Sequence, residues 1–225
     1  MATNIPPHNL GEVIDATVHL IDNPQATPLE LMQFIKGPDL PTYGSIHGIN
    51  SLRELYSTGH GSFTMRGTAV VEEKPQGGER IIVTALPYLV NKENLVKRIA
   101  ELVKDGVVPG ISNIKDLSSS RTGIKIEIQV KRNAMGDVVL NQLYKHSQLQ
   151  TSFGGHFLVV DHGRPRVMTL AQILQAYIDH RLEVITRRCQ FDLAKAEARA
   201  HVLEGLIIAV DNIDEVIKII RGSRT

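Results

Sequence analysis

Residues 169–209 have the sequence TLAQILQAYIDHRLEVITRRCQFDLAKAEARAHVLEGLIIA, and this stretch decides the architecture. It contains no proline, and its only glycine is Gly205, close to the end. Most of its residues are good helix formers, so the composition predicts one continuous helix. About 40 residues at about 1.5 Å each make a rod of roughly 60 Å, which is longer than an ordinary globular helix.

Apolar residues recur along this predicted rod at steps of three and four. They are Ile178, Leu182, Ile185, Cys189, Leu193, Ala196, Ala200, Leu203, Ile207 and Val210. The spacing is typical of a coiled-coil seam, and the irregular step from Cys189 to Leu193 indicates a local stutter. A seam of this kind needs a partner helix. We expect that helix to be absent from this sequence, because residues 211–225 are too short to run back along the rod.

Helix signals also occur before the rod. Asn9 is placed to cap a helix to Ile21 in which apolar residues recur at helical spacing, and capping boxes at 27–30 and 51–54 predict short helices to about Ile35 and Ser57. Asn91 caps a predicted amphipathic helix that ends before Gly106. Two further helices are expected at residues 135–146 and from Asn212 to Gly222.

Strand signals lie between these helices, at residues 62–73, 80–86, 111–117, 123–130 and around 161–165. The turn 74–78 joins the first two as an antiparallel hairpin. Residues 123–130 alternate isoleucine or valine with polar residues, so we expect one face of that strand to be buried and the other wet. The expected fold class is therefore α+β: an antiparallel-sheet domain flanked by helices (residues 1–168), a long coiled-coil helix (169–210) and the start of a further helical region (211–225).

Composition limits the function. A chain of 225 residues with 42% hydrophobic residues can bury a core, and a formal net charge of +1 argues against a surface generally coated by nucleic acid. Any DNA contact must then come from local basic patches. The single cysteine, Cys189, excludes an intrachain disulfide and fits a reducing cytoplasm, and no apolar run approaches the roughly 20 residues of a membrane span. The extended segment Ile5-Pro6-Pro7 suggests that something precedes it.

Residues for catalysis are not evident. None of the five tyrosines lies beside an arginine or histidine in a glycine-bounded loop, so partly buried aromatics are the simpler interpretation. The nine histidines are scattered along the sequence without the close pairing of a zinc site, the aspartates form no acidic cluster for magnesium, and glycine-rich phosphate loops are absent. We predict no catalytic residue and no metal ligand.

Basic residues give the candidate DNA-binding positions: Arg121, Lys125, Lys131, Arg132, Lys145, Arg164 and Arg166. The first four surround a predicted strand that carries one acidic residue, Glu127, and the last two flank a hairpin tip. They could face a phosphate backbone, or they could be charges that protect a solvated sheet edge. Arg181, Arg187 and Arg188 at the near end of the rod have Glu183 and Asp192 as ion-pair partners.

Seven segments together resemble one known family. They are MATNIPPHNL (1–10), GPDLPT (37–42), LPYLVNK (86–92), VVLNQLY (138–144), LQTSFG (149–154), HRLEV (180–184) and RAHVLEGL (199–206). In this order they resemble the A subunit of bacterial type IIA DNA topoisomerases, DNA gyrase first and topoisomerase IV as a close second. The sequence departs from the family pattern at Leu40, where phenylalanine is common, and in the segment 155–157. These departures bear on the subfamily only.

The resemblance implies a place within a larger enzyme. In the family, a winged-helix head is followed by a tower, then a two-helix coiled coil that ends in a dimerising exit gate. Residues 1–168 are similar to the tower, 169–210 to the outgoing helix and 211–225 to the beginning of the gate. The family's catalytic tyrosine belongs to the head, which would precede Met1, so no residue here takes that role. The implied partners are double-stranded DNA, a second A subunit, and a B subunit in an A2B2 complex, with ATP and Mg2+ bound by the B subunit.

Two other interpretations stay open at this point. One is a free-standing, non-catalytic adaptor that uses the same scaffold to bind DNA or topoisomerase subunits. The other is a regulatory coiled-coil protein unrelated to DNA, which leaves the ordered series of motifs unexplained.

Overall fold

The structure is a computed structural model that describes residues 4–75 and 77–223. Gln76, in the predicted turn 74–78, and Met1 to Thr3, in the first family segment, lie outside the described residues, as do Arg224 and Thr225 of the last predicted region. The chain divides into two compact units, one ending at Gln175 and one beginning at Ala176.

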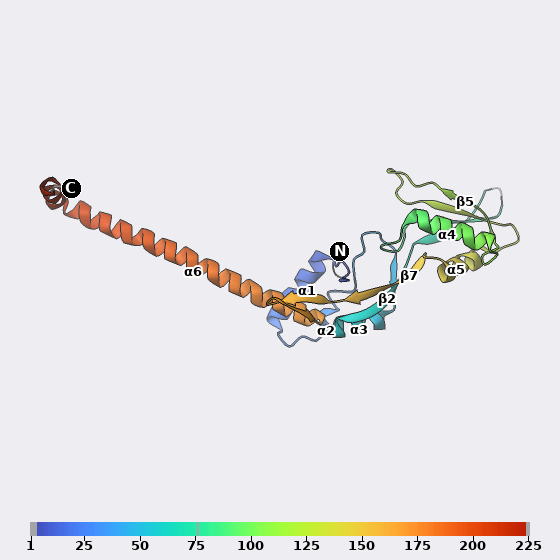
Figure 1. The fold of residues 1–225 in the computed structure, drawn as a ribbon, viewed down its shortest axis with the longest axis horizontal. Helices are drawn as coiled ribbons and strands as arrows, with labels where there is room; N and C mark the ends of the chain where they lie inside the picture. Colours follow the sequence, from blue (N-terminus) through green and yellow to red (C-terminus); the bar gives the residue numbers. More distant parts are fainter. Residues whose placement is uncertain (1–3, 76, 224–225) are drawn as a thin grey trace. The chain divides into compact units, whose positions relative to one another are not determined.

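The first unit contains three antiparallel sheets (Figure 1). Their strands are β1 (Ser45–His47), β2 (His60–Arg66), β3 (Ala69–Glu73), β4 (Glu79–Val83), β5 (Ile111–Asp116), β6 (Ile126–Val130), β7 (Gln150–His156), β8 (Leu158–Asp161) and β9 (Arg164–Val167). The sheet orders are β1-β2-β7, β3-β4-β6-β5 and β8-β9. The mixture of these sheets with helices confirms the expected α+β class.

The helices are α1 (Leu10–Asp22), α2 (Pro28–Leu31), α3 (Ile49–Thr58), α4 (Lys92–Lys104), α5 (Gly136–His146), α6 (Leu170–Asp211) and α7 (Ile213–Gly222). Asn9 and Asn91 cap α1 and α4 as predicted, and Thr27 and Glu30 form the predicted capping box. Helix α2 has only four residues and stops short of Ile35. On α1, the predicted apolar positions at 10, 14, 18 and 21 are exposed, and the buried residues are at 16 and 20.

The second predicted capping box is wrong. Helix α3 begins at Ile49, two residues before Ser51, and its N-cap is Gly48, whose φ of 98° lies in the left-handed region. The main-chain N–H of Ser51 instead donates to the Gly48 carbonyl. Glycine adopts this φ without steric cost, so the preceding turn sets the helix start in place of a side-chain cap.

The predicted strand 62–73 is two strands in different sheets, β2 and β3, separated at Gly67. The Gly67 N–H donates to the Leu149 carbonyl at 2.8 Å, and a Cβ at this position would lie 2.5 Å from the Ala85 carbonyl oxygen. Two other segments therefore approach the main chain of Gly67 too closely for a side chain. The sequence pattern of β-formers runs through this point and gives no sign of the change of sheet.

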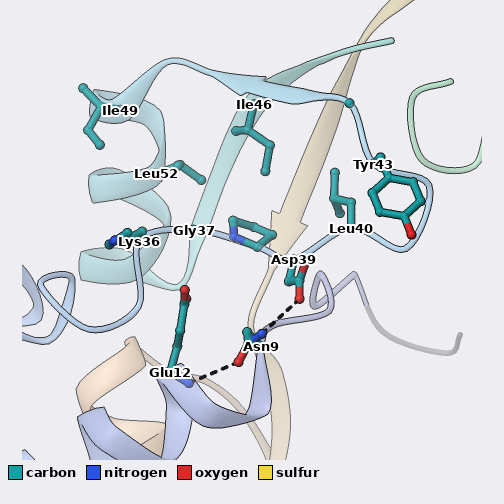
Figure 2. A pocket seen from close by; sticks show the side chains of 12 residues that line it. Asn9, Glu12, Lys36, Gly37, Asp39, Leu40, Tyr43, Ile46, Ile49 and Leu52 are labelled. Atoms are coloured by element: carbon teal, nitrogen blue, oxygen red, sulfur yellow. Dashed lines mark hydrogen bonds between the residues drawn. The ribbon is translucent and has the colours of Figure 1, made fainter. Parts of the chain in front are cut away.

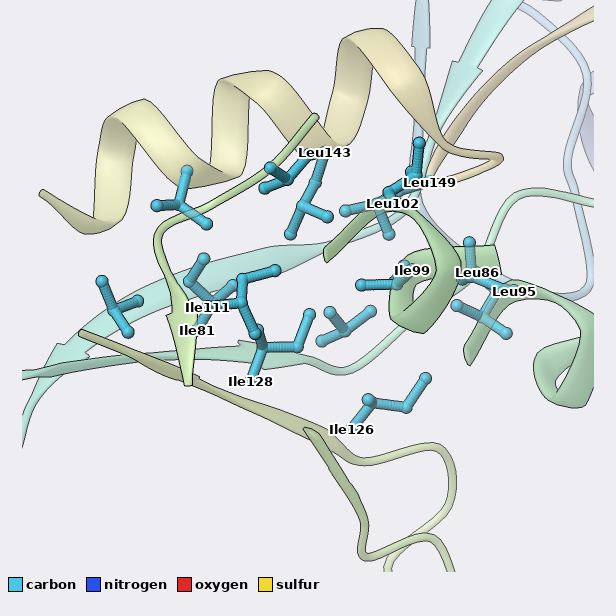
Figure 3. Close-up of a cluster of buried hydrophobic side chains, with 14 residues drawn as sticks. Ile81, Leu86, Leu95, Ile99, Leu102, Ile111, Ile126, Ile128, Leu143 and Leu149 are labelled. Atoms are coloured by element: carbon cyan, nitrogen blue, oxygen red, sulfur yellow. The ribbon is translucent and has the colours of Figure 1, made fainter. Parts of the chain in front are cut away.

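The main core of the first unit lies between the four-stranded sheet and helices α4 and α5 (Figure 3). Its members include apolar residues on one face of β4 and β6 and on the facing sides of the two helices: Ile81, Val83, Leu95, Ile99, Leu102, Ile126, Ile128, Val130, Val139 and Leu143. All of them are buried. Strand β6 is central, with β4 and β5 on either side.

The expectation of a wet second face on β6 is wrong at Glu127, whereas Gln129 is half-buried and Lys125, next to the strand, is exposed. Glu127 is 9% exposed, and its carboxylate accepts hydrogen bonds from Gln129 Nε2 at 2.9 Å and from Arg80 at 3.4 Å. These bonds, with that from Gln129 the larger cause, hold the pKa of Glu127 below its ordinary value. Because β4 and β5 flank this strand, long side chains from neighbouring strands cover its polar residues.

The three-stranded sheet packs on α3. Phe63 and Phe153, paired across β2 and β7, stack with ring centroids 5.3 Å apart on the buried face. Gly61 and Gly155 lie on the same face, where Leu55 of α3 fills the space that a Cβ would need. The opposite face carries polar side chains, including His60, Thr64 and Arg66 of β2.

Helix α6 has 42 residues without interruption, which confirms the long helix predicted from residues 169–209. Within the second unit, residues of the predicted seam are solvent-exposed, for example Leu182 at 61% and Leu193 at 59%. Ile185, Leu203 and Ile207 are exposed as well. Arg187 and Glu183 form the predicted ion pair at 3.7 Å. No helix among the described residues combines the length and the apolar character that a membrane span requires.

Candidate nucleic-acid interface

All seven basic residues that the sequence singles out are exposed. Arg121 lies in the loop between β5 and β6, Lys125 immediately precedes β6, and Lys131 and Arg132 immediately follow it. Six residues of strand span roughly 20 Å, so these cations form two patches at opposite ends of one strand.

The loop that carries Arg121 is held by its own hydroxyl groups. Ser119 and Gly123 exchange main-chain hydrogen bonds, and the Ser119 and Thr122 hydroxyls lie 2.8 Å apart. The Leu117 N–H donates to the Lys125 carbonyl at 2.8 Å. This bonding presents the Arg121 side chain on an ordered loop, which lowers the entropy lost when it binds an anion.

The second patch lies where β6 leads into α5. The Lys131 N–H donates to the Gly110 carbonyl at 2.8 Å, which fixes the main chain at this turn, while its side chain stays exposed. Lys145 lies in the last turn of α5, at the other end of that helix. Arg164 and Arg166 lie on β9, and Arg166 is paired with Asp161 at 2.9 Å.

Charge compensation separates these candidates. Within the part of the chain that the structure describes, Arg166 is the one predicted DNA contact that forms an ion pair. The six candidates without an ion pair there are Arg121, Lys125, Lys131, Arg132, Lys145 and Arg164. A cation without a carboxylate partner keeps its full attraction for phosphate, whereas Arg166 must first give up Asp161. The six unpaired residues are therefore the stronger candidates.

A further basic group was missed. Lys97, Arg98 and His146, together with Asn94, Glu101, Ser147 and Gln148, line a pocket of about 400 Å³ between α4 and the end of α5. Here Lys97 pairs with Glu93 at 2.8 Å and Arg98 with Glu101 at 3.2 Å, so nearby carboxylates balance both cations. The sequence signal for this group was the pair of adjacent basic residues, Lys97 and Arg98, on the polar side of the predicted helix.

Another pocket, of about 560 Å³, has a different chemistry (Figure 2). Asn9 Nδ2 donates to Asp39 at 3.3 Å, and Glu12 and Lys36 are the other charged residues of the wall. Figure 2 shows apolar side chains, Leu52 among them, on the side facing α3. Two carboxylates against one lysine make this pocket a poor site for a phosphate backbone.

His8 forms two partly buried hydrogen bonds. Its Nδ1 donates to the Pro6 carbonyl at 2.8 Å, because that oxygen can only accept, so Nε2 accepts from the Tyr56 hydroxyl at 2.8 Å. Burial lowers the pKa of His8 below its ordinary value of 6.5 and outweighs the opposing effect of the Pro6 carbonyl. Burial also raises the pKa of Tyr56. A buried tyrosine with a raised pKa is poorly suited to attack phosphorus.

We expect the free energy of unfolding to fall as the pH drops below about 6.5, in part because of His8. The folded state binds a proton at His8 less readily than the unfolded chain, so acid favours unfolding until the pH falls below the lowered pKa. Replacing His8 by glutamine should reduce this pH dependence between pH about 7.5 and about 5.5, measured as the change in Tm. An unaltered pH dependence in His8→Gln would contradict the role of burial.

The structure corrects one expectation about histidines. The histidines are scattered along the sequence without close pairing, yet the Nδ1 atoms of His60 and His156 lie 3.2 Å from each other across β2 and β7. They are separated by 96 residues in the sequence, so no local spacing could have shown this. Among the described residues, three or more metal-binding side chains do not come together at any point. Cys189 is an exposed free thiol.

The comparisons with known proteins cover the whole chain. A family model that describes the A subunit of DNA gyrase/topoisomerase IV matches residues 1–225. The chain is 55% identical to the DNA gyrase A subunit of Clostridium acetobutylicum over 225 residues, 49% to that of Mycolicibacterium smegmatis over 229 and 51% to that of Haemophilus influenzae over 224. Each alignment covers 100% of this chain and 27%, 27% and 25% of the relative, so the chain spans about a quarter of the length of these relatives.

Proposed function

The chain belongs to the family of DNA gyrase/topoisomerase IV A subunits, and from that premise we propose that it is part of the DNA cleavage and reunion subunit of an ATP-dependent type II topoisomerase. Within that enzyme, the first unit supplies scaffold and contacts to the DNA arms, and α6 is a rod that sets the spacing between subunits. The match of the family model to residues 1–225 is the observation that carries this proposal.

The complete reaction needs parts beyond these residues. The relatives are about four times as long as this chain, and their name assigns them to a DNA gyrase subunit. We propose double-stranded DNA, a second A subunit, and a B subunit in an A2B2 complex as partners, with ATP and Mg2+ held by the B subunit. The role of this chain is then to hold and position DNA during strand passage, while cleavage chemistry belongs to residues elsewhere in the enzyme.

The charges support a contact with DNA arms. The six unpaired cations occupy exposed positions although the whole chain has a net charge of only +1, so its positive potential is local. The patches at the two ends of β6 are roughly 20 Å apart, about the length of six base pairs. One duplex lying along this strand could therefore reach both patches.

The long helix supports the rod. Its seam residues are apolar and exposed. They stabilise the helix only when another helix covers them. A coiled coil of this length is stiff, so it can hold two attached parts of an enzyme at a fixed separation. We propose that the covering helix comes from the remainder of the A subunit, as in the family that the sequence resembles.

Binding to duplex DNA tests the proposal. We expect the purified chain to bind a duplex of about 30 base pairs in fluorescence anisotropy, with an affinity that falls steeply as salt is raised. Neutralising Arg121, Lys125, Lys131 and Arg132 together to glutamine should weaken binding at low salt by at least about 10-fold. It should also reduce the slope of log K against log salt by about 0.9 for each phosphate that the variant no longer neutralises.

A matched variant controls for net charge. Lys36, Lys104, Lys195 and Lys218 are exposed and do not adjoin β6 in the sequence, and neutralising these four should change the slope little. Equal losses in the two variants would mean that only total charge matters. No binding by the unmodified chain at low salt would overturn the proposal that these patches contact DNA independently.

A further inference from the structure

Two histidines face each other at one end of the β2–β7 pair. His60 is the first residue of β2, His156 is the last of β7, and the two are paired in register. Their Nδ1 atoms are 3.2 Å apart, their ring centroids are 5.3 Å apart, and the rings are tilted by 80°. His60 is exposed and His156 is half-buried, so solvent reaches the pair.

The main chain explains why the side chains come so close. The His156 N–H donates to the Asn4 carbonyl at 3.0 Å and therefore points away from β2, while the next residue, Phe157, donates to the Gly59 carbonyl at 2.7 Å. This is the pattern of a non-hydrogen-bonded pair in an antiparallel ladder, in which opposite side chains lie closest. Both rings then point to the same face of the sheet.

The nitrogen separation fits a hydrogen bond in which one Nδ1–H donates to the other Nδ1, and it also fits two ligands on one metal ion. A divalent zinc ion binds imidazole nitrogen at about 2.0–2.1 Å, so two nitrogens on one ion are about 2.9 Å apart at a right angle and about 3.4 Å apart at a tetrahedral angle. The observed 3.2 Å lies between these values. We propose that His60 and His156 bind one divalent cation that prefers nitrogen ligands, zinc above all, through their two Nδ1 atoms.

The surroundings leave room for the rest of the coordination shell. Gly154 lies two residues before His156 on the same face, and nothing within 4 Å would meet a Cβ there. Because the described residues bring no third histidine, cysteine or carboxylate to this place, water completes the coordination. A site with two imidazoles and no carboxylate excludes Mg2+ and Ca2+, which require oxygen ligands.

The bound ion would clamp one end of the three-stranded sheet. It joins the start of β2 to the end of β7, next to the hydrogen bond between Phe157 and Gly59. A ligand that binds the folded state alone stabilises it, by about 100-fold in the folding equilibrium at a free concentration 100 times Kd. Metal availability would thereby regulate the stability of the unit proposed to hold DNA. This consequence rests on the proposed function, whereas binding of the ion does not depend on it.

Calorimetric titration of the full chain with zinc tests the site. The background variant is Cys189→Ser, because this exposed thiol is another group that could bind zinc. We expect one zinc per chain, weaker binding at pH about 5.5 than at about 7.5, since protons compete for imidazole, and no response to Mg2+. His60→Gln and His156→Gln should each raise Kd at least 10-fold and abolish the increase in Tm.

The control lies on the same face of the same sheet. His47 is opposite Thr64, roughly 13 Å along β2 from His60, and His47→Gln should leave zinc binding and the Tm increase unchanged. As a second readout, Cu2+ bound to the chain should show nitrogen coupling in its electron paramagnetic resonance spectrum that is lost in His156→Gln. Retention of zinc binding in the double variant, or equal weakening by His47→Gln, would overturn the proposal. The DNA titration stays independent of either result, because it uses other residues and no metal.

Discussion

Replacing Gly59 by alanine is expected to lower the free energy of unfolding of the first unit by about 3 kcal/mol or more. Gly59 ends α3 with a φ of 76°, where its N–H donates to the Leu55 carbonyl at 2.8 Å and its carbonyl accepts from Phe157. An alanine Cβ would collide with the Met168 main-chain carbonyl and with Val167. The left-handed φ alone costs about 1–2 kcal/mol for a residue with a Cβ, and the collision adds to it.

Two other glycines separate these contributions. Gly106 also has a positive φ, 72°, but nothing lies within 4 Å of the position that a Cβ would take, so Gly106→Ala should cost about 1 kcal/mol. Gly154 has neither constraint, and Gly154→Ala should be nearly neutral. A loss in Gly59→Ala no greater than in Gly106→Ala would contradict the close approach of Met168.

The measurement must report on the first unit. The chain has no tryptophan, and the long α6 contributes strongly to any helical signal. Urea unfolding followed by hydrogen exchange of peptides from β2 and β7 reports on the strands next to Gly59. Exchange of α6 peptides beyond Ala176 serves as the internal reference, because that segment belongs to the other unit.

Truncating Ile128 to alanine should cost about 2–5 kcal/mol, because it empties the centre of the main core. Ile128 is 0% exposed and lies on β6, between β4 and β5 and beneath α4 and α5. Ile128→Val, which removes one methylene, should cost about 1 kcal/mol. Both values are free energies of unfolding, measured by urea unfolding with hydrogen exchange of β4 and β6 peptides.

Ile128→Ala also tests whether packing of β6 in the core keeps the two basic patches in place. Because β6 carries one basic patch at each end, loosening it should weaken DNA binding under conditions where part of the population is unfolded. Val70→Ala is the matched control, since Val70 lies on β3 of the same sheet, separated from β6 by β4, and is 54% exposed. A change of less than about 1 kcal/mol in Ile128→Ala would show that the core does not close around this side chain.

Local signals in the sequence determined much of the fold. Caps at Asn9, Thr27 and Asn91 depend on hydrogen bonds within three residues, so the sequence alone places these helix starts. The uninterrupted α6 follows from composition over about 40 residues, because helix propensity is a property of each residue type. Family membership was also readable, because the ordered motifs extend along the whole chain.

The tertiary structure alone decided the features that join distant residues. The division at Gly67 depends on Ala85 and Leu149, the covered face of β6 depends on Arg80, and the His60–His156 pair joins positions 96 residues apart. The sequence alone identified basic residues on either side of a predicted strand, whereas the ion pair of Arg166 with Asp161 became visible only in the structure. The sequence thus determined what depends on neighbouring residues and on residue type, whereas sheet pairing decided which distant side chains share a face and how far apart they lie.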